Sequence, residues 1–168
     1  LTMSIPNIEI AYIYEHMVLA WFDKKIQKKD MTPLIKAMED GDCEKFGNFL
    51  TELLGDTISF YDYKESYYHG FLTGILKCFQ KYIVLSNQET GLGRSDIILQ
   101  ETKFRGRGVI LELKVTKDID KMEKMCEKAL QQIEENQYEQ ILKKEGCREI
   151  LKYGICFFKK GCIVKKAE

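Results

Sequence analysis

The stretch GLGRSDIILQETKFRGRGVILELKV, residues 91–115, decides the fold that we expect for this chain. An apolar run typical of a strand covers residues 95–100, and a polar, charged segment with glycines covers residues 101–108. Residues 109–115 then alternate with a period of two. The pattern predicts two antiparallel strands joined by a turn.

Three residues of the second strand, Ile110, Glu112 and Lys114, share one face because successive side chains of a strand point to opposite sides of the sheet. Asp96 stands near the start of the preceding strand. Antiparallel pairing therefore brings its carboxylate near Glu112 at one end of the sheet. The hairpin is predicted to carry an acidic pair with a lysine beside it.

This trio suits metal-assisted cleavage of a phosphodiester. Two carboxylates held a few ångströms apart repel each other unless a cation lies between them, and Mg²⁺ binds one or two carboxylates together with waters and phosphate oxygens. We expect Mg²⁺ or Mn²⁺ on Asp96 and Glu112, with the main-chain carbonyl of Leu113 as a further ligand. Lys114 would orient or deprotonate the attacking water, or offset negative charge in the transition state.

The motifs GRSD at residues 93–96 and ELK at residues 112–114 resemble the PD-(D/E)XK nuclease superfamily, and the glycine-x-x-aspartate opening resembles its RecB-like branch. The surrounding text resembles the C-terminal nuclease domain of bacterial AAA-ATPase-like fusion proteins; its most similar parts are KESYYHGFLTGIL, SNQETGLGRSDI, ALQQIEENQY and KYGICF. The resemblance covers roughly residues 56–164.

The resemblance implies an α/β fold, a restriction-endonuclease-like αβββαβ core with a mixed central sheet flanked by helices. Periodicity agrees, with a helix over 64–81, a strand over 82–87, the hairpin, helices over 119–144, and strands over 148–158 and 162–166. An all-helical segment precedes this core, with helices over 5–28, 32–39 and 42–54. We expect residues 1–55 to form a helical connector packed on the core, and residues 56–168 to form the nuclease-like domain.

The same resemblance implies a metal-dependent nuclease in the bacterial cytoplasm, with DNA as the expected nucleic acid. It also implies an AAA-ATPase-like domain on the N-terminal side as a partner within one longer protein. No phosphate-binding GxxxxGK[ST] motif occurs, and the first residue is Leu1. We therefore expect this chain to be the C-terminal portion of that protein.

Two residues of the helix before the first strand, Glu65 and His69, lie four apart and share a helix face. In the resembled superfamily this helix often lends an acid to the metal site, and in RecB-like members a histidine. Both residues are therefore candidate ligands, and Glu65 a candidate catalytic residue. Alternatively, Glu65 favours the helix N-terminus electrostatically and His69 is a hydrogen-bonded packing residue.

Gln132 falls in the helix after the E-x-K strand, where the resembled branch has a glutamine beside the active site. Glutamines on helices otherwise usually face solvent. RecB-like members pair this glutamine with a tyrosine four residues on, whereas Tyr138 comes six residues later. The pattern departs there, so no role is assigned to Tyr138.

Charge is unevenly distributed along a chain whose formal net charge is zero. Residues 1–60 contain ten acidic and six basic residues. Residues 61–168, which carry most of the nuclease resemblance, therefore have a mild excess of positive charge. Five basic residues around the hairpin are candidates for phosphate contacts, namely Arg94, Lys103, Arg105, Arg107 and Lys117. The alternative is a solvated hairpin tip.

The six cysteines include no CxxC pair, so reduced thiols in a cytoplasmic protein are expected. An iron–sulfur cluster on Cys147, Cys156 and Cys162 is disfavoured because such clusters take four thiolates. No signal sequence and no apolar run near twenty residues occurs, so no membrane association is expected.

Two other functions remain open. A catalytically idle nuclease-fold module could bind nucleic acid or protein, and an acidic-pair metal enzyme could act on a small phosphate. Asp96, Glu112 and Lys114 are all present, which favours the nuclease. The neutral net charge keeps the idle module under consideration.

Overall fold

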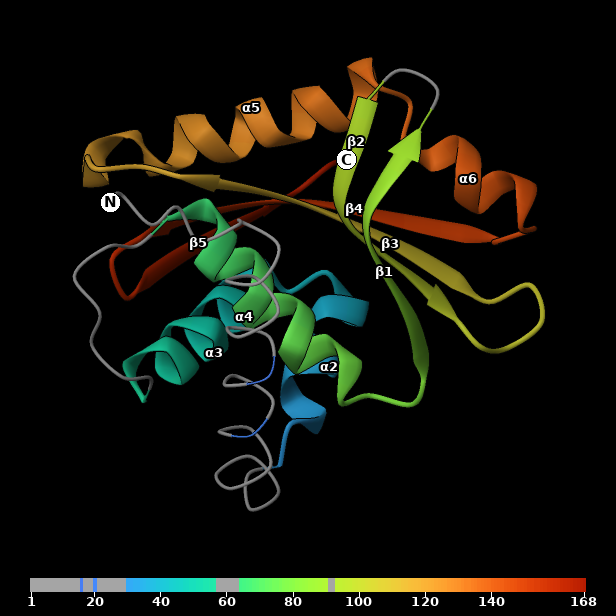
Figure 1. The fold of residues 1–168 in the computed structure, drawn as a ribbon, viewed down its shortest axis with the longest axis horizontal. Coiled ribbons are helices and arrows are strands. Elements are labelled where there is room, and N and C mark those ends of the chain that lie inside the picture. The colour runs from blue at the N-terminus through green and yellow to red at the C-terminus, as the bar shows by residue number, and fades with distance from the viewer. Residues whose placement is uncertain (1–15, 17–19, 21–29, 57–63, 91–92) are drawn as a thin grey trace, which may run out of the picture.

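The computed structural model describes residues 16, 20, 30–56, 64–90 and 93–168 (Figure 1). The helix expected over 5–28 lies outside these residues, apart from 16 and 20. None of the described helices is long and apolar enough to cross a membrane.

A five-stranded mixed sheet forms the centre of the protein, in the order β1-β2-β3-β4-β5. Its strands are β1 (Tyr82–Thr90), β2 (Gly93–Glu101), β3 (Arg107–Val115), β4 (Glu149–Phe158) and β5 (Gly161–Lys166). Neighbouring strands are antiparallel except β3 and β4, which are parallel. A parallel pair needs a long crossover, and α5 (Met122–Glu135) and α6 (Glu139–Lys144) supply it.

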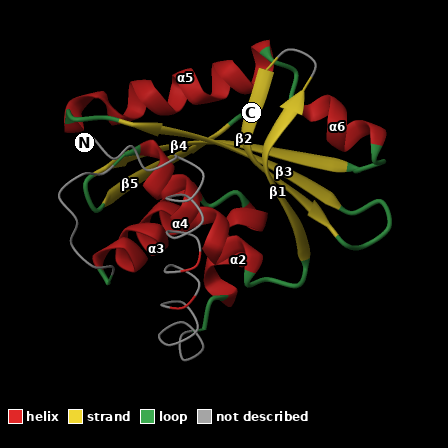
Figure 2. Cartoon of the chain, viewed as in Figure 1, coloured by secondary structure: helices red, strands yellow, loops and turns green. Residues whose placement is uncertain are grey.

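Helices cover both faces of this sheet (Figure 2). On one face lie α2 (Thr32–Asp40), α3 (Cys43–Gly55) and α4 (Glu65–Lys77), and on the other lie α5 and α6, with a 3-10 turn, η2 (Ile119–Lys121), before α5. The predicted restriction-endonuclease-like α/β architecture, with an N-terminal helical region, is confirmed.

Strand β3 divides its side chains between two apolar cores, as its alternation predicts. Val109, Leu111 and Leu113 belong to the core shared with α2, α3 and α4. Ile110 belongs to the opposite core, with Ile133 of α5 and others. All five are essentially buried, so the register of β3 is strongly determined by burial on both faces.

The N-terminal helices α2 and α3 belong to the same core as the sheet. Leu34 and Phe46 have no exposed surface, and Phe46 packs edge-on against Tyr153 of β4 at 5.7 Å between ring centroids. Between the two helices, Gly41 takes a left-handed φ of 74° and Asp42 accepts a hydrogen bond from the main-chain N–H of Lys45. The division at residues 55 and 56 stays a prediction.

Candidate active site

The predicted acidic pair is present at one end of the hairpin. Strands β2 and β3 pair with Ile97 opposite Leu111, so Asp96 and Glu112 follow at the next position of the antiparallel register. The main-chain N–H of Leu113 donates a hydrogen bond of 2.8 Å to Asp96 Oδ2. This bond fixes the Asp96 carboxylate against β3, beside Glu112.

Glu112 is the most deeply buried charged residue that the structure describes. Its side chain is almost fully buried, with 1% relative exposure. One oxygen, Oε1, accepts a hydrogen bond from Lys114 Nζ at 3.1 Å, whereas Oε2 is buried without a hydrogen-bond partner among the described residues. Burial, and then the nearby charge of Asp96, raise the pKa of Glu112 to about 7.

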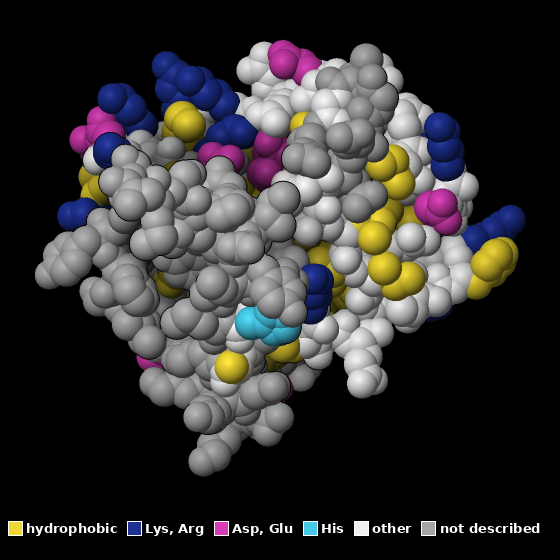
Figure 3. All heavy atoms as spheres, viewed as in Figure 1, with side chains coloured by type: hydrophobic (Ala, Val, Ile, Leu, Met, Phe, Trp, Pro, Cys, Tyr) yellow, Lys and Arg dark blue, Asp and Glu magenta, His cyan; other side chains and the backbone are white. Residues whose placement is uncertain are grey.

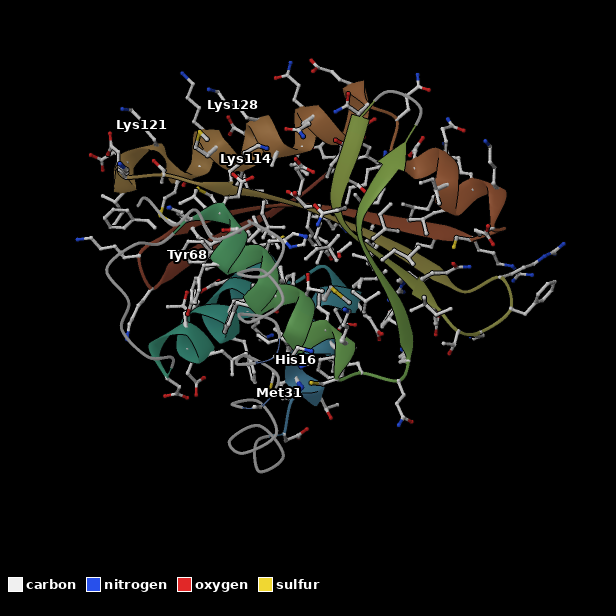
Figure 4. The ribbon with its side chains drawn as sticks, viewed as in Figure 1. His16, Met31, Tyr68, Lys114, Lys121 and Lys128 are labelled. Atoms are coloured by element: carbon white, nitrogen blue, oxygen red, sulfur yellow. The ribbon has the colours of Figure 1, made fainter. Side chains whose placement is uncertain are left out.

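Lys114 is held between the sheet and α5 (Figure 4). Its Nζ donates to Glu112 Oε1 and, at 2.7 Å, to Gln132 Oε1. The amide Nε2 of Gln132 donates in turn to the Tyr138 hydroxyl at 3.3 Å, and Asn136 Nδ2 donates to the same hydroxyl at 3.0 Å. The structure thus brings the predicted Gln132 to Lys114 and fixes the orientation of its amide.

Tyr138 reaches Gln132 despite its unusual spacing because the helix ends between them. Helix α5 stops at Glu135, and Gln137 takes a left-handed φ of 51°. The chain therefore turns back, and Tyr138 has no exposed surface. Asn136, which the sequence reasoning missed, lies at this stop; an asparagine just after a periodic helix is a recognised C-terminal signal.

A model of the PD-(D/E)XK nuclease superfamily matches residues 63–167, more than half of the chain. The chain belongs to the PD-(D/E)XK nuclease superfamily. No protein of curated function matches its sequence. The predicted superfamily is therefore confirmed, and its members are generally nucleases that hydrolyse phosphodiester bonds.

The site of this PD-(D/E)XK chain fits a hard divalent cation. A buried carboxylate oxygen without a partner is costly unless a cation or donor meets it, and Glu112 Oε2 is such an atom beside a second carboxylate. Oxygen donors are what Mg²⁺ and Mn²⁺ prefer. Asp96 and Glu112 would hold the ion, and the role of the Leu113 carbonyl stays a prediction.

Glu65 and His69 are placed differently from each other. Glu65 is exposed in the first turn of α4. His69 Nε2 lies 3.0 Å from the main-chain oxygen of Asp96, so its ring contacts the backbone of the acidic pair. The described residues contain no cluster of three or more His, Cys, Asp or Glu able to hold a metal. Neither residue therefore forms one cluster with the Asp96 and Glu112 carboxylates, and their roles as ligands stay predictions.

The predicted phosphate-binding residues do not form one group: three lie around the β2–β3 turn and two lie elsewhere. Lys103 and Arg105 are exposed in the β2–β3 turn, and Lys117 is exposed just beyond the other end of β3. Arg107 instead has protein partners: its Nε donates to Glu149 Oε2 at 2.7 Å and its Nη1 to a main-chain oxygen in α2 at 3.1 Å. Arg94 lies in β2, with its side chain outside the described part.

The two ends of the hairpin are well separated. Glu112 is five positions along β3 from Arg107, a span of ~17 Å at ~3.4 Å per residue. The turn lies beyond Arg107, at the end of the sheet away from the site (Figure 1). Side chains in the turn therefore cannot contact the same phosphate as Lys114.

Proposed function

We propose that this chain is a divalent-metal-dependent nuclease that cleaves DNA at the Asp96, Glu112 and Lys114 site. One observation carries the proposal: Glu112 Oε2 is buried without a hydrogen-bond partner in the described chain and lies beside Asp96. The other oxygen of the same carboxylate contacts Lys114 Nζ at 3.1 Å. In a purely structural ion pair, an oxygen such as Oε2 would carry a desolvation cost with no compensating contact. The arrangement offers two acidic oxygens to a cation and one ammonium to a phosphate.

The cation would be Mg²⁺ or Mn²⁺. When bound, it supplies Lewis-acid chemistry, polarising the phosphodiester and making water acidic enough to attack near neutral pH. Asp96 and Glu112 would hold it. Deprotonated Glu112 is required for this, and a cation beside it favours that form.

Lys114 is the group that acts on the reacting atoms. An ammonium has three N–H donors, and two of them are directed at Glu112 and Gln132. The third is available for the attacking water or a non-bridging phosphate oxygen. Negative charge grows on the phosphate oxygens during attack, so this donor stabilises the transition state more than the bound substrate.

Gln132 is a positioning residue in this proposal. Its Oε1 accepts from Lys114 and its Nε2 donates to Tyr138, so the buried hydroxyl fixes which end of the amide faces the lysine. Lys114 is thereby held in one rotamer without being neutralised.

The wider setting of the enzyme rests on sequence resemblance. The G-x-x-D opening at residues 93–96 supports placement in the RecB-like branch, and the text around it supports linkage to an AAA-ATPase-like domain in a longer bacterial protein. All six cysteines are free thiols, which suits the reducing cytoplasm.

The test is cleavage of labelled single- and double-stranded DNA and RNA, with Mg²⁺ or Mn²⁺ and with EDTA. We expect metal-dependent cleavage of DNA that Lys114→Ala lowers by ~10² to 10³, the typical effect of losing one transition-state donor. Lys128→Ala is the matched control, because Lys128 is an exposed lysine on α5 (Figure 4). Equal activity of wild type and Lys114→Ala on every substrate would support the idle module instead.

A further inference from the structure

The tip of the β2–β3 hairpin presents an aromatic ring to solvent. Phe104 is 86% exposed, more than any other large hydrophobic residue that the structure describes. The guanidinium carbon of the next residue, Arg105, lies 5.5 Å from the centre of the ring. Figure 3 shows a protruding hydrophobic side chain beside basic ones at the edge where this turn lies in Figure 1.

A pocket of about 450 Å³ lies next to this ring, and its acidic residues are already engaged. Glu39 accepts a hydrogen bond of 2.5 Å from Lys81 Nζ, and Glu149 accepts one of 2.7 Å from Arg107 Nε. Glu101 Oε2 accepts the main-chain N–H of Arg107 at 2.9 Å. Arg107 thus binds the base of the tip to β4, and its Nη1 binds it to the Glu39 main-chain oxygen of α2. The engaged carboxylates leave little acidic charge to face a ligand.

Three further cations line the pocket, and none has an acidic partner within the described chain. Lys103, Arg105 and Arg148 are all exposed and form no ion pair there. Five basic side chains line the pocket against three acidic ones, so positive charge is in excess. The ligand that matches such a surface carries phosphates and a flat apolar group.

We propose that the hairpin tip is a second nucleic-acid contact, which binds a single-stranded segment of the substrate. One unpaired base stacks on Phe104, while phosphates contact Lys103, Arg105 and Arg148. A single strand is specified because bases inside a duplex are stacked on one another and offer no free face to a side chain. The contact rests on the proposed function, since the strand held here is the one cut at the acidic site.

The distance between the two sites gives the contact a length requirement. The tip lies at least ~17 Å from Glu112, which is about five nucleotides of a stacked strand at 3.4 Å per phosphate. A dinucleotide can occupy the acidic site without reaching Phe104. A longer strand can occupy both.

Binding is measured without cleavage, by fluorescence anisotropy of a labelled single strand in EDTA. The strand has ~20 nucleotides, which is longer than the ~4 to 16 nucleotides that one binding module covers. Phe104→Ala and Phe104→Leu should bind about fivefold to a hundredfold more weakly, the range for losing one base–aromatic stack, and Phe104→Trp should bind like wild type. Leucine keeps the apolar character but not the flat ring. Ile119→Ala in η2, beyond the other end of β3, removes an apolar side chain of 60% exposure and should leave the affinity unchanged.

The basic residues are tested by the salt dependence of the same binding. The combined change Lys103→Ala, Arg105→Ala and Arg148→Ala should reduce the slope of log affinity against log salt by about 2, at ~0.7 per lost phosphate contact on a single strand. Unchanged affinity in all Phe104 variants together with an unchanged slope would overturn the proposal. That result is also what a tip that binds a protein partner would give.

Cleavage separates this inference from the proposed function. With Mn²⁺, Phe104→Ala should cut the long strand more slowly at sub-saturating concentration and cut a dinucleotide at the wild-type rate. If wild type cuts neither substrate, the proposed function fails, and the binding measurements alone decide whether the tip contacts nucleic acid. If wild type cuts both and Phe104→Ala cuts and binds both equally well, the tip contact fails.

Discussion

At one end of the β2–β3 hairpin Glu112 is buried beside Asp96, and at the other end Lys103 and Arg105 are exposed to solvent. The buried end holds a carboxylate oxygen without a hydrogen-bond partner in the described chain, whereas the acids at the exposed end are all engaged. The two ends of the same hairpin therefore differ in which charge is left without a partner. Uncompensated acidic charge marks the end where a cation fits, and surplus basic charge marks the end that suits a phosphate chain.

The largest effect should come from removing one ligand at the buried end. Asp96→Asn keeps an oxygen that can accept the Leu113 N–H, so the fold should survive, but Mn²⁺ affinity should fall and cleavage should drop by ~10³ or more, since the metal supplies several kcal/mol of transition-state stabilisation. Calorimetric Mn²⁺ titration and single-turnover cleavage measure both. Lys114→Ala is the comparison: it should lose cleavage and keep metal affinity, and equal Mn²⁺ affinities in the two variants would contradict the assignment.

The buried charge should also lower the stability of the metal-free protein. The pKa of Glu112 is about 7 when folded, against 4.5 ordinarily, so between these values the folded state holds a proton that the unfolded chain has lost. The free energy of unfolding therefore falls as pH rises through this window and levels off above it. Glu112→Gln should be more stable than wild type at about pH 8 by ~1 to 3 kcal/mol, and by much less at about pH 5.

Urea denaturation in EDTA at the two pH values measures this difference. Glu145→Gln, which removes an exposed carboxylate in the last turn before β4, is the control and should show no such pH dependence. A Glu112→Gln effect of the same size at both pH values would show that the buried charge is not its cause.

A smaller effect should come from the hydroxyl that orients Gln132. Tyr138→Phe removes the acceptor of Gln132 Nε2 and of Asn136 Nδ2. We expect kcat to fall by ~2- to 10-fold, the value of one neutral hydrogen bond, with Mn²⁺ affinity unchanged. Tyr153→Phe is the matched control, because its buried hydroxyl donates to Met38 on the opposite face of the sheet; a similar fall in kcat there would mean that stability alone is responsible.

The smallest effect distinguishes two basic residues near the tip. Arg107→Ala should destabilise the fold by ~0.5 to 1.5 kcal/mol, because a partly exposed ion pair and a hydrogen bond to α2 are lost. Lys103→Ala should change stability by less than ~0.5 kcal/mol. Thermal denaturation of the two variants checks this, and equal stability would place Arg107 with the exposed cations rather than with the structural contacts.

The hairpin was predictable because its signals are local. Alternation in β3 placed Glu112 and Lys114 on one face, and the turn placed Asp96 opposite them. The strands proved longer than expected: β1 runs to Thr90 and β2 begins at Gly93. Pairing with neighbouring strands extends a β-strand into polar residues, and the hydrophobic pattern of one segment does not predict that extension.

The rest depended on contacts between distant residues. Arg107 bonds partners 42 and 68 positions away, and His69 meets the backbone of Asp96 across 27 positions. Neither pairing leaves a local pattern, so the sequence alone does not indicate the protein partners of Arg107. The contact of Tyr138 with Gln132 was likewise hidden, because it needs the left-handed turn at Gln137.

In the proposed function, Asp96 and Glu112 hold one divalent cation between them. Crystals grown with Mn²⁺, with anomalous diffraction recorded at the manganese edge, test it most directly. We predict a single anomalous peak in contact with an oxygen of each carboxylate, with Glu112 Oε2 as one ligand and only oxygen ligands around it. A well-ordered site with no anomalous peak at saturating Mn²⁺, or with the peak on cysteine sulfur instead, would contradict the account.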